Sequence, residues 1–245
     1  MKVLILSCST GGGHNSCARY IEEELKDNNI ECEFKDFFDI VNTKAKDMSS
    51  KIYLKTLTHN GKMFSNFYKL GELYSKTKIK SPVYLVNKIH KNTLFKYIVD
   101  NNFTLVIATH LFPIIDNFEK ALRAECKDDS YKKINFITIA TDYEPCPFLE
   151  ETKPNYLIMQ KGLEKAFMAK GISKDILIPS GIPVSSRFIE NAKNIKNEFN
   201  IKNEQVILIM LGSMGFGNIN EIITPLLKEE NIKLIVVCGS NTKLY

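Results

Sequence analysis

A glycine-rich loop that ends in a histidine is the most chemically suggestive feature of this sequence. The loop begins shortly after the apolar run 3–6 and reads Ser9-Thr10-Gly11-Gly12-Gly13-His14. Backbone N–H groups in such a strand-to-helix turn favour an anion or an oxygen-rich group. An imidazole beside them titrates near neutrality and suits proton transfer. The loop therefore predicts a site for acid–base chemistry on a polar substrate.

Two further segments place polar groups directly after apolar runs. Thr109 and His110 follow the run 103–108, and Asp142 and Tyr143 come shortly after the run 134–140. Carboxyl ends of parallel strands lie at one edge of a sheet, where open α/β sheets bind ligands. We expect His14 and His110 to lie at this edge and to face one cleft. Asp142 either orients His14 or binds a substrate hydroxyl, or it only caps a turn.

Two better-known glycine loops fit this sequence less well. The dinucleotide pattern GxGxxG needs a glycine at the position of Ser16, and the phosphate loop GxxxxGK[ST] has no match in this stretch. Asp36, at the end of the predicted second strand, still imitates the acid that binds ribose in a Rossmann site. A third interpretation is that the glycines only permit a tight turn.

The elements that must position these residues alternate between apolar strands and helices. Strands are predicted at 3–6, 31–36, 103–108, 134–140, 156–159 and 176–178, and helices after the glycine loop and at 114–126 and 163–169. Asn15 or Ser16 is the predicted cap of the first helix, which places Glu22 to Glu24 early in it. This order predicts an α/β class, with a Rossmann-like parallel sheet over residues 1–185.

A second unit of the same kind begins after a polar stretch. Residues 186–203 predict a linker helix, followed by a strand at 206–211, a glycine-rich loop at 212–218, a helix at 221–227 and a strand at 234–237. The sequence ends at Tyr245, where the next helix should begin. We therefore expect residues 204–245 to form an incomplete second Rossmann-like unit.

The composition narrows the class of protein. Apolar residues make up 44% of the 245-residue chain, which is ample for a core, but no apolar run approaches the length needed to cross a bilayer. The opening segment is too short for a signal peptide, so we expect a cytoplasmic protein. The six cysteines show no CxxC pair and no spacing typical of metal ligands, which predicts reduced thiols and no metal site.

Basic charge is concentrated in residues 48–97. This segment holds ten lysines and a single acid, a net charge of +9, whereas the whole chain carries +5. Lysines beside aromatic residues are typical of helices that lie on an anionic membrane, and the candidate membrane contacts are Lys51, Lys55, Lys62, Phe64, Phe67 and Lys69. The alternative is a helix pair packed on the sheet with a solvated basic face. Lysine lacks the bidentate fork of arginine, which disfavours nucleic-acid recognition.

The motifs together resemble the monogalactosyldiacylglycerol synthase and processive diacylglycerol glucosyltransferase family. The resemblance covers residues 1 to about 190 and rests on the order and spacing of four motifs, and a fifth opens the second unit. They are Ser9 to His14, Ala108 to Pro113, Thr141 to Tyr143, Ser180 to Val184, and Ile209 to Gly215. Each motif alone is weak, and the series is fairly specific.

The resemblance implies a GT-B glycosyltransferase that transfers a hexose from a UDP-sugar to the 3-hydroxyl of diacylglycerol with inversion, in glycolipid biosynthesis. It implies His14 as general base, with Asp142 or His110 in support, and no cofactor besides the UDP-sugar as co-substrate. It places the acceptor at Gly11, Gly12, Gly13, Thr109, His110 and Tyr143, and the donor at Gly212, Ser213 and Gly215. The expected location is the inner face of the cell membrane, as a peripheral protein with anionic lipids as partners.

Two other functions stay open beside this one. A polyprenyl-linked sugar, as in the peptidoglycan glycosyltransferase, is an alternative acceptor for the same fold. A non-catalytic role is also open, in which the chain is a membrane-docking, acceptor-binding half that works with a separate donor-binding chain.

Overall fold

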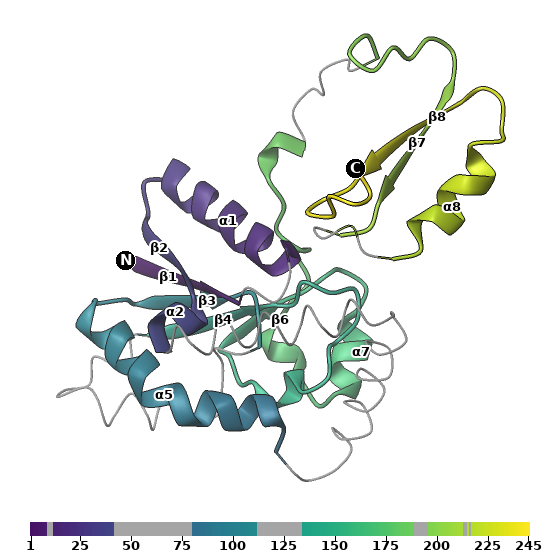
Figure 1. Cartoon of the computed structure of the whole chain (residues 1–245). Coiled ribbons are helices and arrows are strands. Elements are labelled where there is room, and N and C mark those ends of the chain that lie inside the picture. Colours follow the sequence, from purple (N-terminus) through teal and green to yellow (C-terminus); the bar gives the residue numbers. More distant parts are fainter. Residues whose placement is uncertain (9–11, 42–79, 112–133, 189–195, 213–214, 216) are drawn as a thin grey trace. The chain divides into compact units, whose positions relative to one another are not determined.

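A six-stranded parallel sheet is the centre of the chain up to residue 178 (Figure 1). The structure is a computed structural model, and it describes residues 1–8, 12–41, 80–111, 134–188, 196–212, 215 and 217–245. The strands are β1 (Lys2–Ser7), β2 (Glu31–Asp36), β3 (Leu105–Ala108), β4 (Asn135–Ile139), β5 (Tyr156–Ile158) and β6 (Leu177–Ile178). Their order is β2-β1-β3-β4-β5-β6, and every neighbouring pair is parallel. This confirms the predicted α/β class and the Rossmann-like sheet.

The order of the strands creates a switch point between β1 and β3. The chain moves from β1 outward to β2, then crosses back and continues on the other side of β1 with β3 and β4. In open α/β sheets the crevice at such a point lies beyond the carboxyl ends of the strands and is the usual ligand site.

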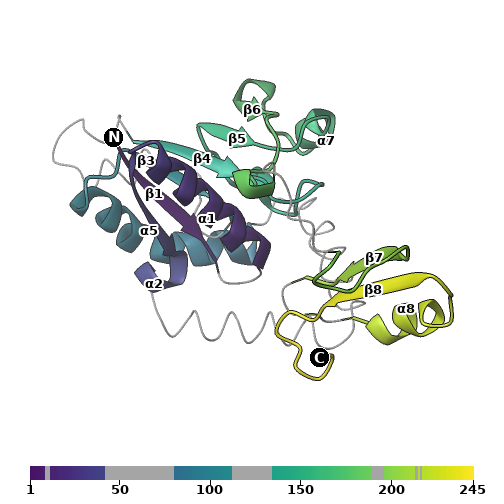
Figure 2. The same cartoon turned by 90° about the horizontal axis from the view of Figure 1, so that it is seen from above.

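Helices cover both faces of this sheet (Figure 2). On one face α1 (Gly12–Asp27) packs Cys17 and Ala18 against Val3 and Ile5 of β1. On the other face α2 (Phe37–Val41) and α5 (Pro82–Asp100) pack on the alternate side chains of the same strand, Leu4 and Leu6. Because successive strand residues point to opposite faces, an apolar run without alternation is what a doubly covered strand requires.

A third core cluster lies around β5. Its buried members are Ala140, Leu149, Leu157, Met159, Phe167 and Ile172. Leu149 comes from the 3-10 helix η2 (Leu149–Glu151) and Phe167 from helix α7 (Glu164–Ala169). The 3-10 helix η3 (Lys174–Ile176) adds the partly buried Ile176. The predicted helix at 114–126 lies outside the described residues.

The first helix begins earlier than predicted. It starts at Gly12, so Gly13 and His14 lie in its first turn, and the proposed caps Asn15 and Ser16 lie inside it. Glu22 to Glu24 consequently lie in its second half, and its first turn contains no acid. The first N–H groups of a helix have no partner within it, so glycines are tolerated there at little cost. Packing of Cys17 and Ala18 on the sheet fixes the rest of the helix.

The described part of the basic segment is a layer of the sheet domain. Helix α5 extends past the predicted limit of residue 97 to Asp100, and Leu94, Phe95 and Ile98 are buried in the core. For this part, the alternative of a helix packed on the sheet is therefore the one observed. The residues proposed as membrane contacts, Lys51, Lys55, Lys62, Phe64, Phe67 and Lys69, lie outside the described residues.

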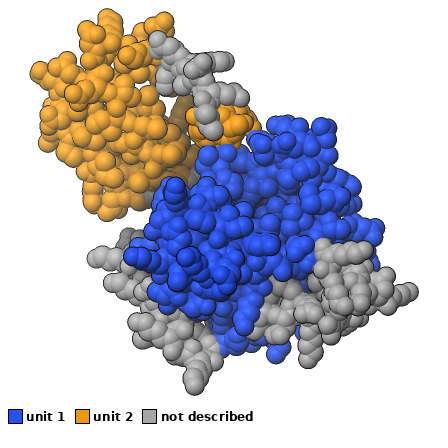
Figure 3. All heavy atoms as spheres, turned by 180° about the vertical axis from the view of Figure 1, so that it is seen from behind, with its two compact units in different colours: residues 1–53, 65–184 blue, residues 54–64, 185–245 orange. Residues whose placement is uncertain are grey.

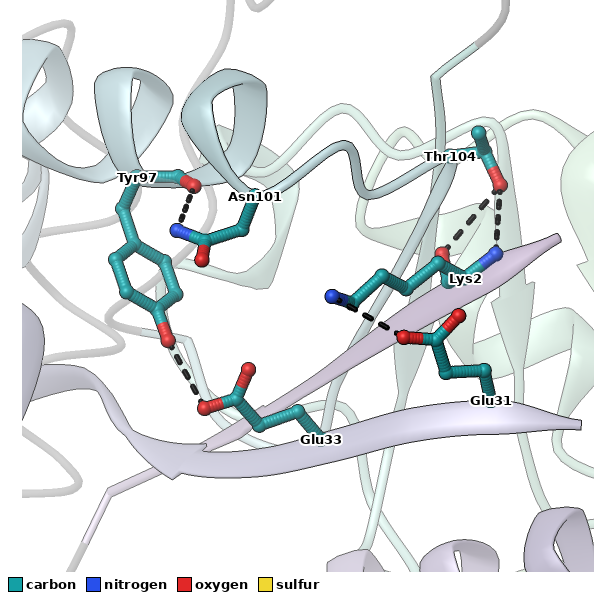
Figure 4. Close-up of polar contacts among 6 residues, drawn as sticks. All are labelled: Lys2, Glu31, Glu33, Tyr97, Asn101 and Thr104. Carbon is teal, nitrogen blue, oxygen red and sulfur yellow. Dashed lines mark hydrogen bonds and ion pairs between the residues drawn. The ribbon is translucent and has the colours of Figure 1, made fainter.

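A polar network closes the opposite edge of the sheet, at the amino ends of the strands (Figure 4). Lys2 forms an ion pair of 3.2 Å with Glu31, and its backbone N–H donates to the Thr104 hydroxyl at 3.3 Å. The Tyr97 hydroxyl on α5 donates to Glu33 on β2 at 3.0 Å. These contacts tie α5 and β2 to the sheet far from the predicted site, so we assign them a structural role.

The residues after Val184 form a second compact unit (Figure 3). It contains β7 (Gln205–Met210) and β8 (Ile232–Val237), paired in parallel, and α8 (Ile219–Leu226). In the described parts of 186–203, the only helix is the 3-10 helix η4 (Ser186–Phe188), where a linker helix was predicted. Residues 189–195 of that prediction lie outside the description.

Candidate functional site

The switch point brings together side chains from three strand ends. His14 stands in the first turn of α1 just after β1, Thr109 and His110 follow β3, and Thr141 lies just after β4. Thr109 and Thr141 contact His14 directly, although they lie 95 and 127 positions from it in the sequence. The prediction that His14 and His110 lie at the same edge of the sheet agrees with this arrangement.

One nitrogen of His14 receives both polar contacts to the ring. Its Nδ1 lies 2.7 Å from the backbone carbonyl oxygen of Thr109 and 2.8 Å from the hydroxyl oxygen of Thr141. Among the described residues no contact of this kind is made to Nε2. Within the part of the chain that the structure describes, the ring is thus anchored through Nδ1.

Thr109 fixes the backbone that anchors this ring. It is almost fully buried, and its N–H donates to the carbonyl of Leu6 at the end of β1 at 2.9 Å. Its hydroxyl donates to the backbone carbonyl of His14 at 3.0 Å. Thr109 therefore locks the end of β3 onto both β1 and the first turn of α1. This contact explains a threonine at 109 without any role in binding an acceptor.

His110 packs its ring edge-to-face with that of His14, with ring centroids 4.7 Å apart and planes at 83°. Burial lowers the pKa of His110 well below the ordinary value of 6.5, and the charge of His14 lowers it further. Burial also lowers the pKa of His14, although the hydrogen bond to Thr109 and the charge of Asp142 oppose the shift. Both rings are therefore neutral near pH 7, as a general base must be before it accepts a proton.

Asp142 and Tyr143 make fewer contacts with the His14 ring than the sequence predicted. Both are exposed, Tyr143 to 71%, and Asp142 acts on His14 through its charge, with no hydrogen bond between the two. The side chain that contacts the ring is the neighbouring Thr141, which the sequence motif contained but to which no role was given. A hydroxyl after a strand gives no signal of its own, because only the register of β4 decides which residue reaches His14.

The remaining predicted acceptor residues are the glycines. Gly12 and Gly13 form the start of α1, and a Cβ placed on Gly13 would meet no other atom within 4 Å. Glycines, which have no side chain, permit a ligand to approach the backbone closely. Gly11 lies outside the described residues.

Asp36 has a local structural function. It is buried at the end of β2, and its carboxylate accepts a hydrogen bond of 2.9 Å from the backbone N–H of Phe38, at the start of α2. This is the pattern of a side chain that caps a helix start. The geometry therefore favours capping over the ribose-binding role of a dinucleotide site.

In the second unit, the predicted donor loop follows β7. Gly215 has a positive φ of 57°, and a Cβ there would clash with the backbone carbonyl of Cys238. The side chain of Asn241 also donates to the Gly215 carbonyl at 2.9 Å. Gly215 is thus required by close packing within the unit. Gly212 also has a positive φ, of 64°, but faces open space, and Ser213 lies outside the described residues.

Neither metal-ligand clusters nor membrane-spanning helices occur in the described ranges. No group of three or more His, Cys, Asp or Glu residues there is arranged to hold a metal ion. Within the same ranges, no helix is both long and apolar enough to span a bilayer. The five described cysteines are all free thiols, and burial raises the pKa of Cys17 and Cys146 to about 12.

The sequence of this chain is similar to those of known glycosyltransferases. The processive diacylglycerol beta-glucosyltransferase of Bacillus pumilus (strain SAFR-032) is 26% identical over 253 residues, and the protein of the same name from Bacillus subtilis (strain 168) is 24% identical over 253 residues. Each match covers 99% of this chain and 62% of the relative. The chain thus spans about three fifths of the length of these curated relatives.

A solved structure supports the fold. The chain superposes on MurG of Acinetobacter baumannii with a TM-score of 0.50 at 10% sequence identity, covering 100% of this chain and 68% of MurG. At this identity the likeness shows the GT-B type of fold and nothing about substrates. The model of the family described as monogalactosyldiacylglycerol (MGDG) synthase matches residues 14–184, which include His14, His110 and Thr141. Because this match covers well over half of the chain, the protein belongs to the MGDG synthase family.

Proposed function

We propose that this chain is the acceptor-binding part of a glycosyltransferase that transfers a hexose from a UDP-sugar to diacylglycerol in glycolipid biosynthesis. The observation that carries the proposal is a neutral, half-buried histidine held at the switch point of a sheet whose sequence matches the MGDG synthase family. A site of this kind supplies a base where an open α/β sheet binds its ligand.

In this proposal His14 is the general base. Its imidazole takes the proton of the 3-hydroxyl of diacylglycerol while that oxygen attacks the anomeric carbon of the sugar. The bond between the anomeric carbon and the diphosphate oxygen breaks, UDP leaves, and the configuration inverts. Asp142 favours the imidazolium that forms, because its negative charge opposes the effect of burial. His110 and Tyr143 border the acceptor, and the buried Thr109 holds the backbone beside them.

The donor side is proposed for the loop after β7, with Gly212, Ser213 and Gly215. Loop N–H groups balance the charge of the leaving diphosphate, so the proposal includes no metal or other cofactor besides the UDP-sugar. Because the chain spans about 62% of its curated relatives, the rest of the donor site is supplied by further residues, in the same polypeptide or in a separate chain.

Membrane association follows from the charge of residues 48–97. A net charge of +9 attracts this segment to anionic lipid by on the order of 1 kcal/mol for each lysine near the surface. This attraction would hold the protein peripherally at the cytoplasmic face of the membrane, where the acceptor resides.

The test uses a fusion in which a relative supplies the rest of the donor-binding residues. In a fusion, residues 1–245 replace the matching part of the Bacillus subtilis relative, and the fusion is incubated with labelled UDP-glucose or UDP-galactose. Vesicles contain diacylglycerol with or without anionic lipid, at low and high salt. We expect labelled glycolipid, faster on anionic vesicles and slower as salt rises, and a loss of about a hundredfold or more in His14→Ala.

Two controls decide between this function and its rivals. Vesicles that carry a polyprenyl-linked sugar in place of diacylglycerol test the other acceptor, and label found only there would contradict the proposal. The chain without the fused part tests activity in isolation. Transfer to diacylglycerol that survives His14→Ala would reassign the base, with Asp142 as the next candidate.

A further inference from the structure

We infer that Thr141, together with the backbone carbonyl of Thr109, holds His14 in the tautomer that is protonated on Nδ1, so that Nε2 is the nitrogen that accepts a proton. Thr141 is thus a positioning residue. The use of Nε2 as the base rests on the proposed function, whereas the tautomer does not.

The first step of the argument is the carbonyl of Thr109. A carbonyl oxygen can only accept, and it lies 2.7 Å from Nδ1 of His14. If Nδ1 carried a lone pair, two acceptors would face each other at this distance. Nδ1 therefore carries the hydrogen, and in the neutral ring Nε2 carries the lone pair.

The second step is the hydroxyl of Thr141, whose oxygen lies 2.8 Å from the same nitrogen. A protonated Nδ1 cannot accept, so the Thr141 oxygen accepts as well, and the two oxygens share one N–H in a three-centre hydrogen bond. The carbonyl acts against the other tautomer because it cannot donate. The Thr141 hydroxyl can donate or accept, and beside this carbonyl it adds a second acceptor to the Nδ1–H form. The two oxygens come from the ends of β3 and β4, so the two strands that flank the site hold the ring from two sides.

The third step concerns the groups that lie near the ring and whether any of them bonds to Nε2. His110 contacts the ring edge-to-face from β3, and Asp142 acts from the end of β4 through charge alone. Among the described residues, these are the titratable groups that contact His14 or act on its charge, and neither supplies a hydrogen bond to Nε2. The carboxylate that the sequence suggested as the orienting group is replaced in this structure by a neutral hydroxyl and a carbonyl. Such partners fix a tautomer without adding a negative charge to the base.

The experiment is ¹⁵N NMR of the full chain with labelled histidine. The chain has four histidines, so the His14 signals can be assigned with His14→Gln. We expect wild-type His14 to show a protonated Nδ1 and an unprotonated Nε2 at pH 7.5. Thr141→Val removes one acceptor at constant shape, and we expect the ratio of the two tautomers to shift about two- to tenfold toward the Nε2–H form. Thr141→Ser should restore the wild-type ratio.

Thr138→Val is the matched control. Thr138 lies three residues earlier in the sequence, on β4, is more buried than Thr141, and has no hydrogen-bond partner for its hydroxyl among the described residues. We expect this variant to leave the His14 signals unchanged. A wild-type ring protonated on Nε2, or a tautomer ratio that Thr141→Val leaves unchanged, would overturn the inference. Neither readout depends on hexose transfer, so a failure of the proposed function is seen separately, in the labelled-sugar assay.

Discussion

His110 and His14 link the chemistry of the site to its stability, because burial lowers the pKa of both rings below 6.5. In the unfolded chain each ring binds a proton as the pH falls through about 6.5, whereas in the folded chain each stays neutral to a lower pH. The unfolded state therefore binds more protons, and the free energy of unfolding decreases as the pH falls. The stability is fully present above pH 6.5 and is lost toward the folded pKa.

At the residue scale this predicts a measurable change in His110→Gln. The wild-type free energy of unfolding should fall between pH 7.5 and 5.5 by up to about 1.4 kcal/mol per pH unit for each proton taken up. The variant lacks the ring with the more strongly lowered pKa, so its stability should depend less on pH. Urea denaturation at both pH values measures the difference. Identical pH slopes in the two proteins would show that His110 is not buried in its neutral form.

A single site residue can be predicted when its own type and its neighbours in the sequence point to its role. His14 and His110 stand out in the sequence because imidazoles are rare and follow apolar runs. Thr141 does not stand out, since its role depends on the strand order and on a contact across 127 residues. Asp142 was favoured over its neighbour because a carboxylate is the stronger chemical signal. The structure instead directs the neighbouring hydroxyl to the ring.

The elements could be predicted more fully than their ends. Short apolar runs bounded by glycine, proline and polar residues located the eight described strands to within about two residues. The start of α1 was missed, since polar residues 15 and 16 offered an attractive cap whereas packing on β1 decides where the helix begins. The packing of α5 was also hidden, because its lysines suggested a membrane surface while Leu94 and Phe95 are core residues.

Helix α5 begins at a junction that connects distant parts of the first unit. Ser81 is fully buried and caps the helix, with its hydroxyl oxygen accepting from the Tyr84 N–H at 3.0 Å. The backbone N–H of Ser81 donates to Glu151 in η2 at 2.8 Å, and its hydroxyl donates to the same carboxylate. One serine thus starts a helix and joins it to a segment 70 residues away.

At the element scale we expect Ser81→Ala to loosen the start of α5. The change removes a helix cap and leaves a carboxylate oxygen without its donor, which costs about 1–2 kcal/mol. Amides in the first turns of α5 should then exchange about 5- to 30-fold faster, as followed by hydrogen-exchange mass spectrometry. Thr93→Ala, at an exposed position of the same helix, should change the exchange little. Equal exchange in both variants would contradict the assigned role of the cap.

At the scale of the whole chain, the two units differ in how well their sheets are covered. The six-stranded sheet has helices on both faces and three buried clusters. The described residues of the second unit contain two strands, and on β7 the side chains alternate in burial. Ile209 is 7% exposed, whereas Leu208 and Met210 are 60% and 62% exposed. One face of this small parallel sheet therefore presents apolar side chains to solvent, which parallel sheets seldom do.

We expect the second unit to open more easily than the first and to bind a hydrophobic dye. Apolar area left in water forgoes about 25 cal/mol per Å² of stabilisation, and two strands supply few compensating contacts. Amides of β7 and β8 should therefore exchange faster than those of β1 and β3. Leu208→Lys and Met210→Lys should reduce the dye fluorescence and leave the exchange of β8 nearly unchanged, because both side chains are already exposed. Ile209→Lys, on the buried face, should instead unfold the unit and increase dye binding. If Leu208→Lys and Met210→Lys left the fluorescence unchanged, the dye-binding surface would have to lie elsewhere, and the apolar face of β7 would be covered in solution.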